Sequence, residues 1–329
     1  MRKRCHHILS LLLILLIVAT GALSCKNHPA KPSISIVMAD YFNSWLSTYA
    51  IREGVITSDK VDVNIVLAVE FDTQMIAGNF PMGAMATSKF AITCELNKLK
   101  FKGISTCVVH EGAEKQEGVN VLFAKAGSTI NSPADLIGKK VGVPDLSSSA
   151  TSVFLGMLKQ DYGISEDQLV LVDRANPLLL QLLRQGEVDV AMLGGNISPQ
   201  AYIDPALKVV WNLDKAFYAK YDSVFFPSML VVEEGYYAKH ADIVRAAYEL
   251  MQASNTYGEQ HLVELSTKYA AEYGQTADFY QYVFKNHSRN KMLPITGKAR
   301  EALMATFDMV RERGIIASLP NPDVVFVSW

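Results

Sequence analysis

The chain has 329 residues, with 31 basic and 33 acidic side chains, and half of its residues are hydrophobic. This balance leaves no excess of positive charge to neutralise phosphates, so a nucleic-acid partner is not expected. The length exceeds what one hydrophobic core usually organises, and two domains of ordinary size are expected.

The N-terminal residues have the pattern of a secretory signal peptide. Basic residues at positions 2–4 precede an apolar run over 8–18, and small residues lead from there to Cys25. This order predicts a signal peptide over residues 1–24. The apolar run is too short for a membrane span, and no later segment reaches about 18 consecutive apolar residues.

The residues before Cys25 resemble a bacterial lipobox, although Ala22 stands where leucine is commoner. The resemblance implies cleavage before Cys25 and lipidation of its thiol. Residues 25–32 would then tether the protein to the extracytoplasmic face of a membrane. An ordinary signal peptide followed by a chance cysteine is the alternative.

Two cysteines remain in the mature region, Cys94 and Cys107. An oxidising compartment permits a disulfide between them. Their spacing carries no metal or redox signature, so two buried free thiols are the favoured interpretation.

Short apolar runs alternate with helical patterns over residues 33–196, which predicts an α/β fold with mostly parallel sheets. Strands are expected at 33–38, 61–69, 102–109, 119–125, 141–143, 169–172 and 188–193. Helices are expected at 45–51, 73–77, 89–96, 132–136, 147–162 and 178–185.

The C-terminal third has a different pattern. After a strand at 229–232, the periodicity predicts helices at 241–257, 261–273, 277–285 and 296–313. Aromatic residues recur on one side of these helices, and such stripes are usually core. We therefore expect packing, and not a ligand site, from Tyr269, Tyr273, Phe279, Tyr280, Tyr282 and Phe284.

Three segments resemble solute-binding proteins of the nitrate, sulfonate, taurine and thiamine-precursor type. The most specific is Ser132–Val143, with its Gly-Lys-Lys-Val-Gly-Val run, followed by Ser147–Thr151. The glycine-bearing segment Phe71–Ala86 and the strand entry Leu182–Ala191 match at the expected distances. The resemblance covers residues 33–260.

The resemblance implies a two-lobe, type II periplasmic-binding-protein fold with a ligand cleft between the lobes and a helical C-terminal part. The first lobe would comprise 33–112 plus 222–329, and the second lobe 113–221. Hinge closure would trap a small molecule. The protein would act as a monomer, deliver that molecule to the permease and ATPase subunits of an ABC importer, and use no cofactor, metal or catalytic residue.

Small hydroxyl residues at a predicted helix start form the first group of candidate ligand contacts. A helix N-terminus presents unpaired N–H groups and a partial positive charge, which suit an anion or a polarised carbonyl. Simple helix capping is the alternative, because one serine is enough for a cap. The group consists of Ser147, Ser148, Ser149 and Thr151.

Residues that follow predicted strands form the second group, because ligands of open α/β sheets bind beyond the carboxyl ends of the strands. Trp45 is suited to stacking on a flat heterocycle, with packing inside the first lobe as the alternative. Asp72 and Thr73 can instead cap the next helix. The candidate contacts are Asn43, Ser44, Trp45, Phe71 and Asn196.

The charges in these loops bear on the class of ligand. Asp40 and Glu70 would oppose a plain anion if they face the ligand, and Arg174 is the one plausible clamp for a carboxylate or sulfonate. A neutral vitamin precursor, such as a pyrimidine or a flavin, is therefore favoured over a sulfonate-like or nitrate-like anion.

Two other classes of function use related folds. One is a ligand-binding sensor or surface adhesin. The other is an enzyme of thiamine-pyrimidine or menaquinone-precursor chemistry. The sequence has no GxSxG, HExxH or paired CxxC motif, so nucleophile and metal chemistry lack support.

Overall fold

The computed structural model describes residues 31–328 except 97–99, 110–116, 196 and 288. Ser33–Trp329 form one compact unit. The expected signal peptide, Cys25 and the expected lobe boundary at residue 112 lie outside the described residues. No helix in the described part has the length and apolar character needed to cross a bilayer.

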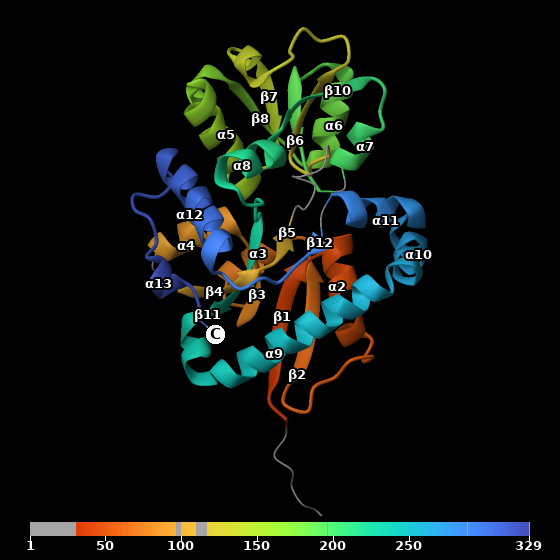
Figure 1. The fold of residues 1–329 in the computed structure, drawn as a ribbon, viewed down its shortest axis with the longest axis vertical. Coiled ribbons are helices and arrows are strands. Elements are labelled where there is room, and N and C mark those ends of the chain that lie inside the picture. Colours follow the sequence, from red (N-terminus) through yellow and green to blue (C-terminus); the bar gives the residue numbers. More distant parts are fainter. Residues whose placement is uncertain (1–30, 97–99, 110–116, 196, 288, 329) are drawn as a thin grey trace, which may run out of the picture. The chain divides into compact units, whose positions relative to one another are not determined.

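The first lobe is built on a five-stranded sheet with the order β2-β1-β3-β11-β4 (Figure 1). β1 is parallel to β2 and β3, and β11 is antiparallel to both β3 and β4. The chain therefore leaves β1, β2, β3 and β4 at the same edge of the sheet. The strands are β1 (Ser33–Ala39), β2 (Asp62–Ala68), β3 (Met82–Ala86), β4 (Phe101–Thr106) and β11 (Ser228–Glu233).

The second lobe is built on a sheet with the order β10-β6-β9-β7-β8. β7 is parallel to β8 and β9, whereas β6 is antiparallel to β9 and β10. The expected α/β, two-lobe fold is confirmed. The strands are β6 (Val121–Lys125), β7 (Lys140–Val143), β8 (Val170–Asp173), β9 (Val190–Leu193) and β10 (Leu207–Asn212).

Helices flank both sheets (Figure 1). Around the first sheet lie α2 (Phe42–Arg52), α3 (Phe71–Ile76), α4 (Thr87–Leu96), α9 (Glu234–Gln260), α10 (Leu262–Tyr273), α11 (Ala277–Asn286), α12 (Gly297–Glu312) and α13 (Pro322–Val325). The second lobe has α5 (Ser149–Tyr162), α6 (Asn176–Gln185), α7 (Ser198–Tyr202), α8 (Leu213–Tyr221) and the 3₁₀ turns η2 (Pro133–Leu136) and η3 (Glu166–Gln168). A short ribbon pairs β5 (Val108–Val109) with β12 (Arg289–Asn290).

Helix α12 packs against α4 of the first lobe and α5 of the second. Phe307 of α12 stacks on Phe90 of α4 with ring centroids 5.9 Å apart. On the α5 side, a Cβ added at Gly156 would lie 2.5 Å from Cγ of Met309, so glycine permits the close approach of the two helices. One hydrophobic core therefore runs through both lobes.

The aromatic stripe of the C-terminal helices packs largely as expected. Tyr269, Tyr280 and Phe284 form a buried cluster with Phe42 and Trp45 of α2. The ring of Phe42 lies 4.8 Å from that of Tyr280. Aromatic pairs at such distances add about 0.5–1.5 kcal/mol beyond their burial. The cluster thus fixes α2, and the loop before it, against the C-terminal helices.

Asp214 joins two segments of the second lobe that adjoin the chain crossings. This buried carboxylate accepts hydrogen bonds from the backbone N–H groups of Val119 at 2.6 Å and Asn120 at 3.0 Å. It also accepts one from the Asn120 side chain at 2.8 Å. The start of α8 is therefore fastened to the start of β6.

Cys94 and Cys107 are free thiols, as the spacing indicated. Burial raises the pKa of each to about 12. Both thiols therefore stay protonated in neutral solution, which makes them poor nucleophiles.

Candidate functional site

The carboxyl ends of the parallel strands in the two lobes lead into a common contact region. Ala86 ends β3 and is followed by α4, whereas Val143 ends β7 and is followed by the loop into α5. Open α/β sheets bind ligands beyond such strand ends. We call residues 145–151, which lie between β7 and the first turn of α5, the serine turn.

The serine turn touches the first lobe directly. The backbone N–H of Ser88 donates to Oγ of Ser149 at 2.9 Å, and the Ser88 hydroxyl donates to the carbonyl oxygen of Ser147 at 2.6 Å. These bonds bring the N-terminal ends of α4 and α5 together. The two lobes meet at the place where the sequence predicted ligand contact.

Each hydroxyl predicted to bind ligand has a protein partner in this structure. Oγ of Ser148 accepts the backbone N–H of Thr151 at 3.1 Å and is the N-cap of α5. The same Oγ lies 3.0 Å from the Thr151 hydroxyl. The Ser147 hydroxyl donates to Asp145 at 2.8 Å. Capping and lobe contact therefore account for all four residues without a ligand, and ligand contact stays a prediction.

Lys89 of α4 forms ion pairs with a carboxylate from each lobe. Its Nζ lies 3.3 Å from Oδ2 of Asp72 and 3.7 Å from Oδ2 of Asp145. Asp72 also accepts the backbone N–H of Ala86 at 2.7 Å, and Asp145 that of Ser147 at 2.7 Å. This cluster ties the end of β3 to the serine turn.

The electrostatics of the cluster follow from its burial. Desolvation raises the pKa of Asp72 above its ordinary value, and the Ala86 N–H and Lys89 oppose this shift only in part. For Lys89, burial acts to lower the pKa, but the carboxylates of Asp72 and Asp145 outweigh it and the pKa rises. Lys89 is therefore firmly charged at neutral pH.

Asp72 does not cap a helix, in contrast to one of the alternatives raised by the sequence. The residue before α3 is Glu70, which makes no side-chain cap, and Asp72 lies inside the first turn with its carboxylate directed to Ala86. Lys89 was not among the predicted site residues, because a lone lysine at a helix start carries no motif. Only the fold brings it between two aspartates.

Two aromatic side chains that follow β1, those of Trp45 and Tyr41, have different surroundings. Trp45 is 5% exposed, packs edge-on against Tyr269 at 5.2 Å and lies under the guanidinium of Arg52. Its surroundings favour the packing alternative. Tyr41 is 54% exposed. Desolvation, followed by the negative charge of Asp72, raises the pKa of Tyr41, so its phenol experiences the potential of the charged cluster.

The remaining predicted contacts differ in accessibility. Asn43 and Ser44 are 9% and 2% exposed in the first turn of α2. Phe71 is half-buried and packs against the core that runs through both lobes and against a second core of the first lobe. Arg174 is exposed, and its Nη1 donates to the carbonyl oxygen of Asp173 at 2.6 Å. Asn196 lies outside the described residues.

Arg313, directly after α12, supports the serine turn from behind. Its side chain is 8% exposed. Nη1 donates to the carbonyl oxygen of Leu146 at 2.9 Å and to Oγ of Ser152 at 3.1 Å. Nε and Nη2 bind the two carboxylate oxygens of Glu166. Sequence reasoning had no signal for this role, because the partners are about 150 residues away.

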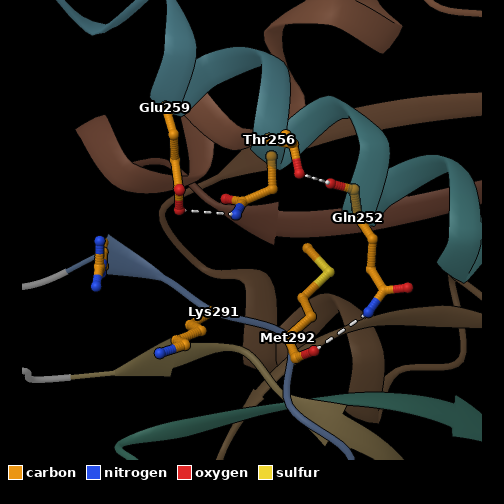
Figure 2. Close-up of a pocket in the computed structure, with 7 residues that line it drawn as sticks. Gln252, Thr256, Glu259, Lys291 and Met292 are labelled. Carbon is orange, nitrogen blue, oxygen red and sulfur yellow. Dashed lines mark hydrogen bonds between the residues drawn. The ribbon is translucent and has the colours of Figure 1, made fainter.

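A pocket of about 360 Å³ lies away from the serine turn, between α9 and the strand β12 (Figure 2). Figure 2 shows Gln252, Thr256 and Glu259 along one wall and Lys291 and Met292 along the other. A second pocket of about 570 Å³ is lined by residues at the C-terminal end of β6 and by residues that precede β9. Within the described residues, no group of three or more histidine, cysteine, aspartate or glutamate side chains is placed to hold a metal ion.

Comparison with known proteins places the chain in a family. Residues 82–261, more than half of the chain, match the family described as NMT1/THI5 like. A comparison with curated proteins found no match.

Solved structures share the fold at low sequence identity. The periplasmic aliphatic sulphonate-binding protein SsuA from Escherichia coli is similar with a TM-score of 0.70 and 14% identity, over 91% of this chain and 93% of that one. The ligand-binding component of an ABC-type import system from Staphylococcus aureus, with zinc bound, gives 0.66 and 12%, over 91% and 97%. A cysteine-to-serine variant of DszB with biphenyl-2-sulfinic acid gives 0.59 and 13%, over 89% and 95%.

Proposed function

The chain belongs to the NMT1/THI5-like family, and from this premise we propose that it is the extracytoplasmic solute-binding protein of an ABC importer. It captures a small polar molecule between its two lobes and passes it to the permease and ATPase subunits. The observation that carries the proposal is the meeting of the two lobes at the strand ends, where Ser88 bonds to Ser147 and Ser149.

The arrangement at this contact suits capture and release. Two polar helix starts face each other, and a few hydrogen bonds and ion pairs hold them together. Such bonds exchange readily with those of a polar ligand, since the net stability of each is only about 0.5–1.5 kcal/mol. A solute that offers the same donors and acceptors can take their place and bridge the lobes.

The favoured ligand is a neutral vitamin precursor of the pyrimidine or flavin type, with a sulfonate-like or nitrate-like anion next. Tyr41 offers an exposed aromatic ring beside polar groups. Aromatic rings of this kind hold flat heterocycles by offset stacking. Among the described residues, the cations at this contact are Lys89, which two carboxylates already engage, and Arg313, which Glu166 already engages.

A thermal-shift screen of the chain from Lys26 onward tests this function. The panel contains pyrimidines, flavins, thiamine, aliphatic sulfonates, nitrate, bicarbonate and amino acids. A solute that binds only the folded state raises the melting temperature. A rise with one class, lost in Ser149→Trp because the indole removes the bond to Ser88 and pushes the starts of α4 and α5 apart, supports a solute-binding protein. A cooperative melt that no solute shifts argues against it and favours a sensor or adhesin.

The enzyme alternative is distinguishable in the same samples. A solute-binding protein returns its ligand unchanged, so mass spectrometry of a ligand recovered after prolonged incubation shows one compound. Conversion of any panel member by the purified chain would contradict the proposal. The protonated thiols of the half-buried Cys94 and the buried Cys107 offer no activated nucleophile for such a reaction.

We further propose that Cys25 carries the lipid anchor. The support is the lipobox-like Ala22-Leu23-Ser24-Cys25 segment at the end of an apolar run. Expression of the full chain and fractionation of the cells tests it. The wild-type chain is expected with membranes and the Cys25→Ala variant in the soluble fraction, whereas Cys94→Ala serves as the matched control and stays with membranes.

A further inference from the structure

The contact region of α4 and α5 contains the groups with which proteins hold oxyanions. These groups are two helix starts, serine hydroxyls and a lysine ammonium. In this chain, two carboxylates of the protein itself already bind the lysine, a serine of the serine turn and the N–H group at the end of β3. Asp145 accepts the N–H and the hydroxyl of Ser147 at 2.7 and 2.8 Å, and Asp72 accepts the N–H of Ala86 at 2.7 Å.

The same two carboxylates neutralise the cation of the site. Nζ of Lys89 lies 3.3 Å from Asp72 and 3.7 Å from Asp145. One positive charge thus faces two negative charges, and each helix start contributes only about half a positive charge. A sulfonate or nitrate bound here would add a negative charge to a region without a cation to spare.

We propose that Asp72 and Asp145 determine the charge specificity of the ligand site, excluding sulfonates and other oxyanions and admitting neutral or amine-bearing solutes. The inference rests on the proposed solute-binding function and names the class of solute. The proposed class of solute differs from the sulphonate named for the similar E. coli structure. At 14% identity, that similarity concerns the fold alone.

Two further carboxylates support the assignment. Asp40 and Glu70 follow β1 and β2, and both contribute, after desolvation and Asp72, to raising the pKa of Tyr41. Their negative potential therefore extends across the ends of the strands in the first lobe. Arg174, the arginine predicted as a clamp, directs Nη1 to the backbone of Asp173. The strand ends as a whole are acidic.

The test is a gain of function. Ethanesulfonate is titrated by calorimetry into the chain from Lys26 onward, as wild type and as Asp72→Asn/Asp145→Asn. Asparagine keeps the size of each side chain and removes its charge. The wild type is expected to show no binding at millimolar concentration. The double variant should bind at least about tenfold tighter, because Lys89 and the serine donors become available to the anion.

Two controls define what the gain means. Asp242→Asn removes one exposed charge on α9 and should leave ethanesulfonate binding unchanged. Lys89→Gln, added to the double variant, should abolish the gain. If the double variant does not fold by circular dichroism, Asp145→Asn alone carries the test, because this carboxyl is 43% exposed, and a smaller gain is expected.

The outcomes separate this inference from the proposed function. Millimolar or tighter binding of ethanesulfonate by the wild type overturns the charge rule and leaves the solute-binding function standing. A folded variant with no gain, or an equal gain in Asp242→Asn, also overturns it. Failure of every neutral and charged solute in the thermal-shift screen bears on the proposed function instead.

Discussion

The guanidinium of Arg313 donates a 2.9 Å hydrogen bond to the carbonyl oxygen of Leu146, across 167 residues of sequence. Leu146 lies in the serine turn, and Arg313 follows the helix that packs against both lobes. The conformation of the turn is therefore set by the C-terminal helix as well as by its own capping bonds. The position of α12 and the geometry of the candidate site are linked.

Removing this support should loosen the serine turn. Arg313→Ala loses the bonds to Leu146, Ser152 and Glu166, and we expect about 1–3 kcal/mol less stability in urea denaturation. Ligand-induced thermal shifts should also decrease, because the turn is no longer held. Arg311→Ala is the matched control. It pairs with Asp308 at the surface and should cost less than about 1 kcal/mol. Equal losses in both variants would contradict the role of Arg313.

The close packing of α5 on α12 makes Gly156 intolerant of a side chain. A Cβ there would lie 2.5 Å from Cγ of Met309, which is fully buried. Gly156→Ala should therefore destabilise the protein by about 1–3 kcal/mol, as overpacking does. Nothing lies within 4 Å of a Cβ at Gly127, so Gly127→Ala should be nearly neutral. Chemical denaturation measures both, and a neutral Gly156→Ala would show that the helices separate easily.

Most of the architecture is predictable from local sequence patterns, because strands and helices have different periodicities of hydrophobic residues. The capping box at Ser132 and the helix start at Ser148 were both predictable from short-range spacing. The sequence pattern predicts no element between 197 and 228, where α7, β10 and α8 lie. β10 follows Pro205 closely and is only six residues long, so its periodicity is too brief to stand out.

The candidate site was predictable only in its location. The rule that ligands bind beyond the carboxyl ends of strands points to Asp40, Glu70 and the serine turn, since these residues come soon after strands. The same rule does not identify Lys89 and Arg313, because their roles depend on partners far away in the sequence. Trp45 shows why two interpretations stayed open at the level of the sequence. An aromatic side chain after a strand suits ligand or core equally, and only the surrounding rings show that it packs.

Two aromatic residues at the start of α2, the N-cap Tyr41 and Trp45 in the helix, should respond differently to truncation. Trp45→Ala removes a buried ring from the cluster with Tyr269 and should cost about 3–5 kcal/mol of stability. Tyr41→Ala should cost less than about 1 kcal/mol, since the ring is 54% exposed. Its ligand-induced thermal shift should nevertheless fall, because the stacking surface is gone. Retention of the full shift in folded Tyr41→Ala would exclude stacking on this ring.

Asp214 is expected to be among the most sensitive polar residues. Its buried carboxylate accepts the N–H groups of Val119 and Asn120, so Asp214→Ala leaves buried donors without their acceptor. The expected loss is about 2–4 kcal/mol in urea denaturation, because each orphaned buried group costs about 1–3 kcal/mol. Asp242→Ala, which removes an exposed carboxylate, should be close to neutral. A small effect of Asp214→Ala would mean that the start of α8 and the start of β6 are held together mainly by apolar packing.

The stability of the protein should fall in alkaline solution through Cys107. Burial raises the pKa of this thiol from 9.0 to about 12. Between these values the unfolded chain releases the proton, whereas the folded chain keeps it. The unfolded state then binds fewer protons, so the free energy of unfolding decreases as the pH rises through this window. Urea denaturation under reducing conditions, below and above pH 9, measures the slope. Cys107→Ala should give a shallower slope than the wild type, and an unchanged slope would assign the effect to Cys94 and the buried tyrosines.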